Sequence, residues 1–190
     1  MAARIPTASL GLTGSPTEDA NASSESTNEN TLQARFEEIR TKYLNHPLRA
    51  ETNDAIKSEK WSVDRIVVFG LGTNLWQLAQ ILDVAKFLAS DGSQIEIFAQ
   101  DLIYERPENQ AFVALLKNSN VQVLTVAKGR PGKDTSKPAA DYITSKTFVY
   151  APFIPNWYAP HLLAGSVPTG WLGSPIDSPL FDLNYFPRTA

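Results

Sequence analysis

The chain has 190 residues, which suits one ordinary domain, and 43% of them are hydrophobic. Its formal net charge of −3, from 17 basic and 20 acidic residues, leaves no basic excess for a phosphate backbone, so nucleic acid is not an expected partner. Cysteine is absent, which excludes disulfides, thiolate metal sites and a cysteine nucleophile.

The hydropathy of the chain indicates the cellular compartment in which we expect the protein. No stretch approaches the ~20 consecutive apolar residues that a membrane-spanning helix requires, and the amino terminus lacks the pattern of a secretory signal. We therefore expect a soluble intracellular protein, cytoplasmic or nuclear, that does not bind membranes. Arg4 among hydroxyl residues leaves a transit peptide as an alternative, although Glu18 and Asp19 follow early.

The first 60 residues divide into two parts. Residues 1–30 hold few bulky side chains, so we expect a disordered tail. Residues 31–45 are expected to form a helix, because apolar residues recur there at intervals of three and four on one face: Leu32, Phe36, Ile39 and Tyr43. That face could pack on the chain's own domain or on a partner. Pro47 favours an end to the helix, and a short helical stretch at 53–60 completes an N-terminal helical extension over 31–60.

From residue 61 to 190 the pattern is that of an α/β domain. Short apolar runs alternate with longer helical patterns, which predicts a Rossmann-like single domain with a mostly parallel sheet flanked by helices. The expected strands are 65–69, 94–98, 121–126 and 147–150, and the expected helices are 74–89 and 107–117. Residues 128–137 are expected to be a loop. The proline-rich stretch 166–190 is expected to wrap over the surface, anchored by Trp171, Leu180, Phe181 and Phe186.

A glycine turn between the first strand and its helix is the main candidate site. Gly70 and Gly72 stand where backbone N–H groups at a helix start can hold a phosphate or an adenosine, with Thr73 and Asn74 completing the turn. The dinucleotide pattern G-x-G-x-x-G is incomplete, because Leu75 replaces the third glycine. The alternative interpretation is a purely structural helix-start turn.

Polar residues after the second strand extend this candidate site. Gln100 and Asp101 lie where an acidic side chain could accept hydrogen bonds from ribose hydroxyls. A nucleotide-like ligand, either S-adenosylmethionine or a dinucleotide, would fit these positions, although no cofactor is certain and a loop carboxylate would look the same. His46 and His161 have no partner at metal-ligand spacing, so we expect no metal site, and we expect each histidine to have a surface or cap role.

No catalytic couple emerges from the remaining residues. Asp64, Asp83 and Asp177 cannot be paired into an acid and a base from the sequence. Residues 156–160 follow the fourth strand and could line the crevice, where Trp157 and Tyr158 offer stacking surfaces, but such aromatic residues also commonly cover a core.

The order of these segments resembles the SRR1-like domain family, named for a plant protein of red-light and circadian signalling and found also in fungi and animals. The resemblance covers Arg65 to Ile176, and we expect a member of the fungal type. Its best segments are Val68 to Gly72, Gln77 to Ala79, Gln100 with Asp101 and Tyr104, and Thr147 to Pro155.

Departures from the family pattern bear on function. Phe153 and Ile154 stand where many members carry His-Cys, Leu102 stands where a proline is frequent, and Gly173-Ser174 stands where the family tends to have Gly-Asn. The resemblance implies a Rossmann-like regulatory or interaction protein without an established catalytic mechanism, for which a protein partner or a small ligand is possible. Whether the chain is an enzyme, and its oligomeric state, stay open.

Overall fold

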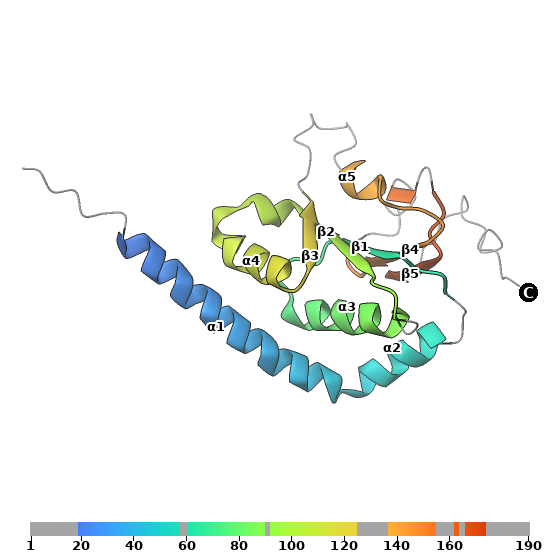
Figure 1. The fold of residues 1–190 in the computed structure, drawn as a ribbon, viewed down its shortest axis with the longest axis horizontal. Coiled ribbons are helices and arrows are strands. Elements are labelled where there is room, and N and C mark those ends of the chain that lie inside the picture. The colour runs from blue at the N-terminus through green and yellow to red at the C-terminus, as the bar shows by residue number, and fades with distance from the viewer. Residues whose placement is uncertain are drawn as a thin grey trace, which may run out of the picture.

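Five parallel strands form the sheet at the centre of the computed structural model (Figure 1). Their spatial order is β3-β2-β1-β4-β5. The strands are β1 Arg65–Phe69, β2 Glu96–Gln100, β3 Val121–Leu124, β4 Thr147–Ala151 and β5 Gly170–Gly173. The structure describes residues 19–57, 61–89, 92–124, 137–154, 162–163 and 166–173.

The helices are placed on both sides of this sheet. Those described are α1 Asp19–Leu44, α2 Pro47–Lys57, α3 Leu75–Leu88, α4 Gln110–Asn118 and α5 Lys137–Ala140, with short 3₁₀ turns η1 Leu102–Glu105 and η2 Pro107–Asn109. Figure 1 shows α1 to α4 on one side of the sheet and α5 on the other. The predicted Rossmann-like α/β fold is therefore confirmed.

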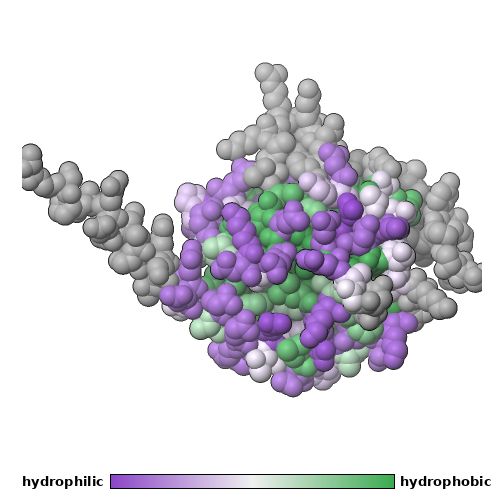
Figure 2. Space-filling view, viewed as in Figure 1, coloured by the Kyte–Doolittle hydropathy of each residue, from purple (hydrophilic) through white to green (hydrophobic). Residues whose placement is uncertain are grey.

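Alternation along the strands creates a core on each face of the sheet. Ile66 and Val68 of β1 point toward the face covered by α1 to α4, whereas Val67 and Phe69 point toward the face covered by α5. Because both faces are covered, the middle residues of β1 and β2 are apolar, as expected for a parallel sheet, and the polar residues Arg65, Glu96 and Gln100 stand at the strand ends. In the view of Figure 2, which is that of Figure 1, polar residues cover much of the surface, and apolar residues show between them near the centre.

The topology defines a switch point beside β1. From β1 the chain proceeds to β2 and β3 on one side, with α3 and α4 on the first face, and it then returns to place β4 and β5 on the other side of β1. The connection to β4 carries α5 and the connection to β5 carries Leu162 and Leu163, all of which pack on the second face. Strand order reverses between β1 and β4, and ligands of such sheets bind outside the strand ends at this place.

The helix α1 is longer than predicted. It begins at Asp19, so residues 19–30, expected in a disordered tail, belong to the helix; residues 1–18 lie outside the described part. Phe36 and Tyr43 are fully buried in the first core, and α1 lies along α3 and α4 (Figure 1). The predicted apolar face therefore packs on the chain's own domain. Polar residues before Thr31 gave no periodic signal from which the earlier start could be predicted.

Two other boundaries near the amino-terminal half also differ from the prediction. The second helix begins at Pro47 rather than at residue 53, because proline is well accommodated at the first helical position, where its missing N–H needs no partner. The strand β2 begins at Glu96 and ends at Gln100, two residues later than predicted. The predicted loop at 128–137 lies almost wholly outside the described residues.

The strand β5 was not predicted, and Trp171 lies in it rather than in a surface wrap. A Cβ added at Gly170 would stand 2.6 Å from the Trp61 ring and 2.7 Å from the Phe148 ring, so a larger residue would not fit there. Packing beside β4 thus requires glycine at position 170, whereas the prolines of 166–190 led to the expectation of a surface wrap. The other proposed anchors, Leu180, Phe181 and Phe186, lie outside the described part.

Candidate functional site

The glycine turn directly follows β1, as the sequence predicts, and the strand order places it at the switch point. Gly70 and Gly72 directly follow β1 and have φ angles of 67° and 60°, in the left-handed region that favours glycine. A Cβ at Gly72 would meet no atom within 4 Å, and one at Gly70 would meet Ile154 Cδ1 at 3.6 Å. Backbone conformation, rather than lack of space, therefore requires glycine at both positions.

Asp101 holds this turn in place. Its Oδ2 accepts the N–H of Gly72 at 2.9 Å, and its Oδ1 accepts the N–H of Ile103 at 3.1 Å, which caps η1. The carboxylate thereby joins the turn after β1 to the end of β2. The Gly72 N–H, which a bound phosphate would need, is already donated to Asp101. Each carboxylate oxygen has a second lone pair that could accept another hydrogen bond, but both oxygens already accept a backbone N–H group.

Gln100 also has a structural function. Its side chain is 5% exposed and lies on the second face, where Oε1 accepts the N–H of Ala139 at 3.2 Å. Its backbone carbonyl accepts the N–H of Gly70 at 3.3 Å. Gln100 thus fixes both α5 and the glycine turn to β2.

Asn74 and Thr73 lie at the start of α3. Asn74 is the N-cap residue, and its Oδ1 accepts the N–H groups of Trp76 and Gln77 at 3.1 and 3.2 Å. Both Thr73 and Asn74 are exposed, and both line a cavity of about 660 Å³ that α1 and the start of α4 complete. The predicted site residues therefore separate into a turn held by Asp101 and Gln100 and a neighbouring cavity.

A polar network joins α2 to α3 and β4, and sequence reasoning did not find it. Arg49 Nε donates to Asp83 Oδ2 at 2.8 Å, and Asp83 is only 7% exposed. Nearby, the Tyr150 hydroxyl donates to Gln80 Oε1 at 2.8 Å, while Gln80 Nε2 donates to the buried Thr52 hydroxyl at 3.3 Å. The partners stand 28 to 70 positions apart in the sequence, so no spacing pattern reveals them.

This network and its surroundings shift several pKa values. The hydrogen bond to Asp83 raises the pKa of Arg49 above its ordinary value. Burial, followed by the charge of Asp83, raises the pKa of Tyr43 to about 12. Burial also raises the pKa of Tyr150, with a smaller contribution from Tyr43. Each of these shifts favours the protonation state that the group already has at neutral pH, so none prepares a base or a nucleophile.

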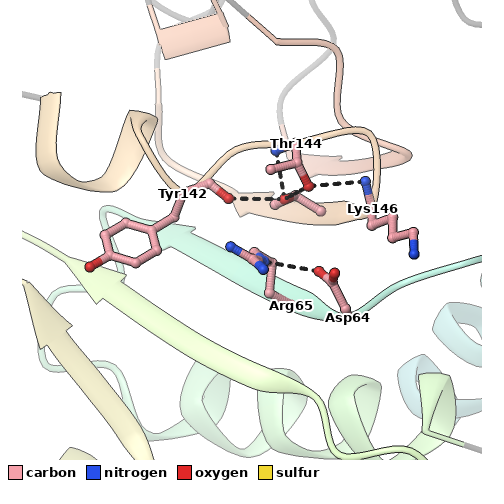
Figure 3. Close-up of polar contacts among 6 residues, drawn as sticks. Asp64, Arg65, Tyr142, Thr144 and Lys146 are labelled. Atoms are coloured by element: carbon pink, nitrogen blue, oxygen red, sulfur yellow. Dashed lines mark hydrogen bonds and ion pairs between the residues drawn. The ribbon is translucent and has the colours of Figure 1, made fainter.

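A second polar cluster lies at the amino-terminal edge of the sheet, opposite to the glycine turn (Figure 3). Arg65 Nε donates to Asp64 Oδ1 at 2.9 Å. Beside them, the buried Thr147 hydroxyl donates to the carbonyl of Tyr142 at 3.1 Å and accepts the N–H of Thr144 at 2.8 Å. The contacts of Thr147 close the turn before β4. The contact of Arg65 places Asp64 in an ion pair rather than in an acid–base couple.

His46 has a cap role, as expected. It is exposed, and its Nδ1 accepts the N–H of Leu48 at 3.1 Å in the first turn of α2. Its ring also packs edge-on against Trp76, with 5.1 Å between ring centroids. His161, Asp177 and residues 156–160 lie outside the described part of the chain.

Neither a metal-binding cluster nor a membrane-spanning helix is found in the described part of the chain. No three histidine, aspartate or glutamate side chains within the described ranges gather in an arrangement that could hold a metal ion. None of the helices in the same ranges combines the length and the apolar character needed to cross a bilayer.

These features define a doubly wound α/β protein with a glycine turn at its switch point. Residues 29–179 match the SRR1 domain family, and since this range covers most of the chain, the protein belongs to that family. The match includes α1 from residue 29 and all of α2, whereas the sequence resemblance began at Arg65. No curated protein and no solved structure matches the chain.

Proposed function

We propose that the protein is a regulatory or interaction module of the SRR1 type that performs no catalysis at its glycine turn. The observation that carries this proposal is the engagement of Asp101, whose two oxygens accept the N–H groups of Gly72 and Ile103. The turn then serves to fix the carboxyl ends of β1 and β2. We also place the protein inside the cell, in the cytoplasm or nucleus, in keeping with its lack of cysteine.

The neighbouring residues support the same function. Gln100 is buried and bound to Ala139, and Asn74 caps α3, so the polar groups that the sequence offers to a cofactor stabilise the fold instead. Phe153, which stands where the resemblance expects a histidine, is 65% exposed after β4. An apolar exposed residue suits contact with a partner better than proton transfer.

A nucleotide-type ligand at the turn is the second candidate. The space beside Gly72 and the position of the turn at the switch point favour it. Such a ligand would take the Gly72 N–H from Asp101 or bind beside it, and S-adenosylmethionine and dinucleotides are the classes that the turn suits best. This candidate would make the protein a sensor or an enzyme.

Thermal unfolding with added ligands distinguishes the two candidates. The full chain is heated alone and with millimolar S-adenosylmethionine, NAD⁺, NADP⁺ or ATP. A ligand present at 100 times its dissociation constant stabilises the folded state by about 2.7 kcal/mol, which raises Tm by several degrees. We expect no such rise. A rise that disappears in Gly72→Val would support the second candidate, and measurable turnover of any of these compounds would refute the non-catalytic proposal.

A further inference from the structure

The cavity beside the glycine turn has the size and the walls of a small-molecule site. Its volume of about 660 Å³ lies within the range of roughly 300–1,000 Å³ that is usual for ligand pockets. It opens between α1, the start of α3 and the segment that begins α4. Its lining includes Arg35 of α1, Thr73 and Asn74 before α3, Glu108 before α4 and Ala111 of α4.

Apolar side chains from three helices form much of the wall. Leu32 and Ile39 of α1 and Trp76 of α3 are partly buried, whereas Phe112 of α4 is 3% exposed. Phe112 stacks on Tyr104, whose buried hydroxyl has no hydrogen-bond partner among the described residues. An aromatic or aliphatic body would therefore replace water against an apolar surface that is already in place.

Arg35 supplies a positive charge at this cavity. Its neighbours on α1 are paired, since Arg40 contacts Glu37 at 3.6 Å and Lys42 contacts Glu38 at 2.6 Å. Arg35 forms no ion pair within the described residues; it adds only the smallest of the contributions that lower the pKa of Glu38. Its guanidinium is thus available to an anion, which it can hold through two parallel hydrogen bonds.

The other polar groups of the wall decide where an anion can lie. Glu108 precedes α4, where a carboxylate stabilises the helix start, and its charge would repel an anion placed beside it. Asn74 uses its Oδ1 for the N-cap, which leaves its amide donors for a ligand, and the Thr73 hydroxyl is a further donor. The donors lie just before α3 and on α1, so the anionic group belongs on that side.

We propose that this cavity binds a small organic anion, in which a carboxylate, sulfonate or phosphate ester is carried on an aromatic or aliphatic body. Arg35 holds the anionic group, and Leu32, Ile39, Trp76 and Phe112 contact the body. This ligand site is separate from the turn that Asp101 holds, and it goes beyond the proposed function by giving the module a ligand. It does not depend on whether the glycine turn binds a nucleotide.

Two fluorescent probes that differ in charge test this proposal. 8-Anilinonaphthalene-1-sulfonate carries a sulfonate on an aromatic body, and N-phenyl-1-naphthylamine is its uncharged counterpart. Each is titrated into the full chain and into Arg35→Gln. We expect saturable binding of the sulfonate at one site, weakened about two- to fivefold by Arg35→Gln, as for an exposed ion pair. Binding of the uncharged probe is expected to be the same in both proteins.

Further variants locate the binding. Arg40→Gln removes a charge five residues further along α1 that does not line the cavity, so it is expected to leave both titrations unchanged. Glu108→Gln should strengthen sulfonate binding, because it removes a repelling charge. Ala111→Leu should weaken both probes by filling the cavity, while leucine keeps the helix intact. Thermal unfolding of each variant shows that it is folded.

The outcomes are distinct. Dependence of the sulfonate, but not of the neutral probe, on Arg35 supports the proposal. Equal effects of Arg35→Gln and Arg40→Gln would show that the sulfonate responds only to the net charge of the surface, which would overturn the proposal. An unchanged titration in Ala111→Leu would overturn it too, because the probes would then bind outside the cavity. Absence of saturable binding of either probe would overturn it as well.

Discussion

At the scale of single residues, Asp101 provides the hydrogen-bond acceptor for two backbone N–H groups, those of Gly72 and Ile103. The turn after β1 needs a partner for the Gly72 N–H, and the structure supplies it from the end of the neighbouring strand at 2.9 Å. We therefore expect Asp101→Ala to lower the free energy of unfolding by about 1–3 kcal/mol, because two backbone N–H groups lose a charged acceptor. Urea-induced unfolding followed by circular dichroism measures this change.

Asp141 provides the control for Asp101. It is an exposed carboxylate with no hydrogen bond or ion pair among the described residues, so Asp141→Ala should change the stability by less than about 0.5 kcal/mol. If the two variants unfold at the same urea concentration, Asp101 does not hold the turn, and the basis of the proposed function is lost.

The ion pair of Arg49 and Asp83 gives a second prediction at this scale. Asp83 is 7% exposed, so removal of Arg49 leaves a nearly buried carboxylate without its cation. Because Arg49 itself is 40% exposed, solvent reduces the effect, and we expect Arg49→Ala to cost about 1–2 kcal/mol. Chemical denaturation provides the measurement.

Arg40→Ala is the matched control, since its pair with Glu37 on α1 is about half exposed at both ends. Such pairs contribute little, and a loss below about 0.5 kcal/mol is expected. If Arg40→Ala lowers the free energy of unfolding as much as Arg49→Ala does, the burial of Asp83 does not strengthen its ion pair.

At the scale of elements, α1 is part of the folded unit. Phe36 and Tyr43 are 1% and 0% exposed, in the core that α3 and α4 share. A chain that begins at Thr31 keeps these side chains and should unfold at nearly the same temperature as the full chain. A chain that begins at His46 lacks them, and we expect it to be largely unfolded, because loss of one buried aromatic side chain alone costs about 3–5 kcal/mol.

Phe36→Ala in the full chain separates this effect from that of truncation. It should lower the stability by about 3–5 kcal/mol without removing any backbone. Calorimetry on the two truncated chains and on this variant provides the measurement. A cooperative unfolding transition in the chain that begins at His46 would instead show that α1 covers a surface meant for a partner.

At the scale of the whole molecule, the sequence predicts the helices and strands whose own residues show a hydrophobic pattern. The β-branched run of β1 and the apolar helix α3 were placed within a residue, because burial on two sides leaves a pattern in the residues themselves. The start of α1 and the edge strand β5 carry no such pattern. Gly170 can be understood only from the rings of Trp61 and Phe148, which lie far from it in the sequence.

The sequence predicts that the residues of the candidate site lie near one another, but it does not predict their hydrogen bonds. Spacing places Gly70, Gly72 and Asp101 at the same edge of the sheet, since the carboxyl ends of parallel strands meet there. Whether a carboxylate at that edge accepts a ribose hydroxyl or the Gly72 N–H depends on angles and distances that spacing does not fix. The same limit applies to Asp83, whose partner Arg49 stands 34 positions away.

Alkaline stability tests how tightly the tyrosines of the whole core are enclosed. Burial raises the pKa values of Tyr43, Tyr104 and Tyr150, to about 12 for Tyr43, above the value near 10 of the unfolded chain. The unfolded state therefore loses its phenol protons first, so the stability is fully present below pH 10 and is lost as the pH rises toward 12.

Tyr43→Phe should reduce this loss, because it removes one of the protons that the folded state retains. We expect the variant to lose less stability than the wild type between pH 10 and 12, by on the order of 1–2 kcal/mol. Urea midpoints at pH 8, 10 and 11.5 measure the difference, and the values at pH 8 correct for any effect of the substitution on packing. Parallel curves across the three pH values would mean that Tyr43 ionises in the folded protein as readily as in the unfolded chain, which would require α1 to open away from α3.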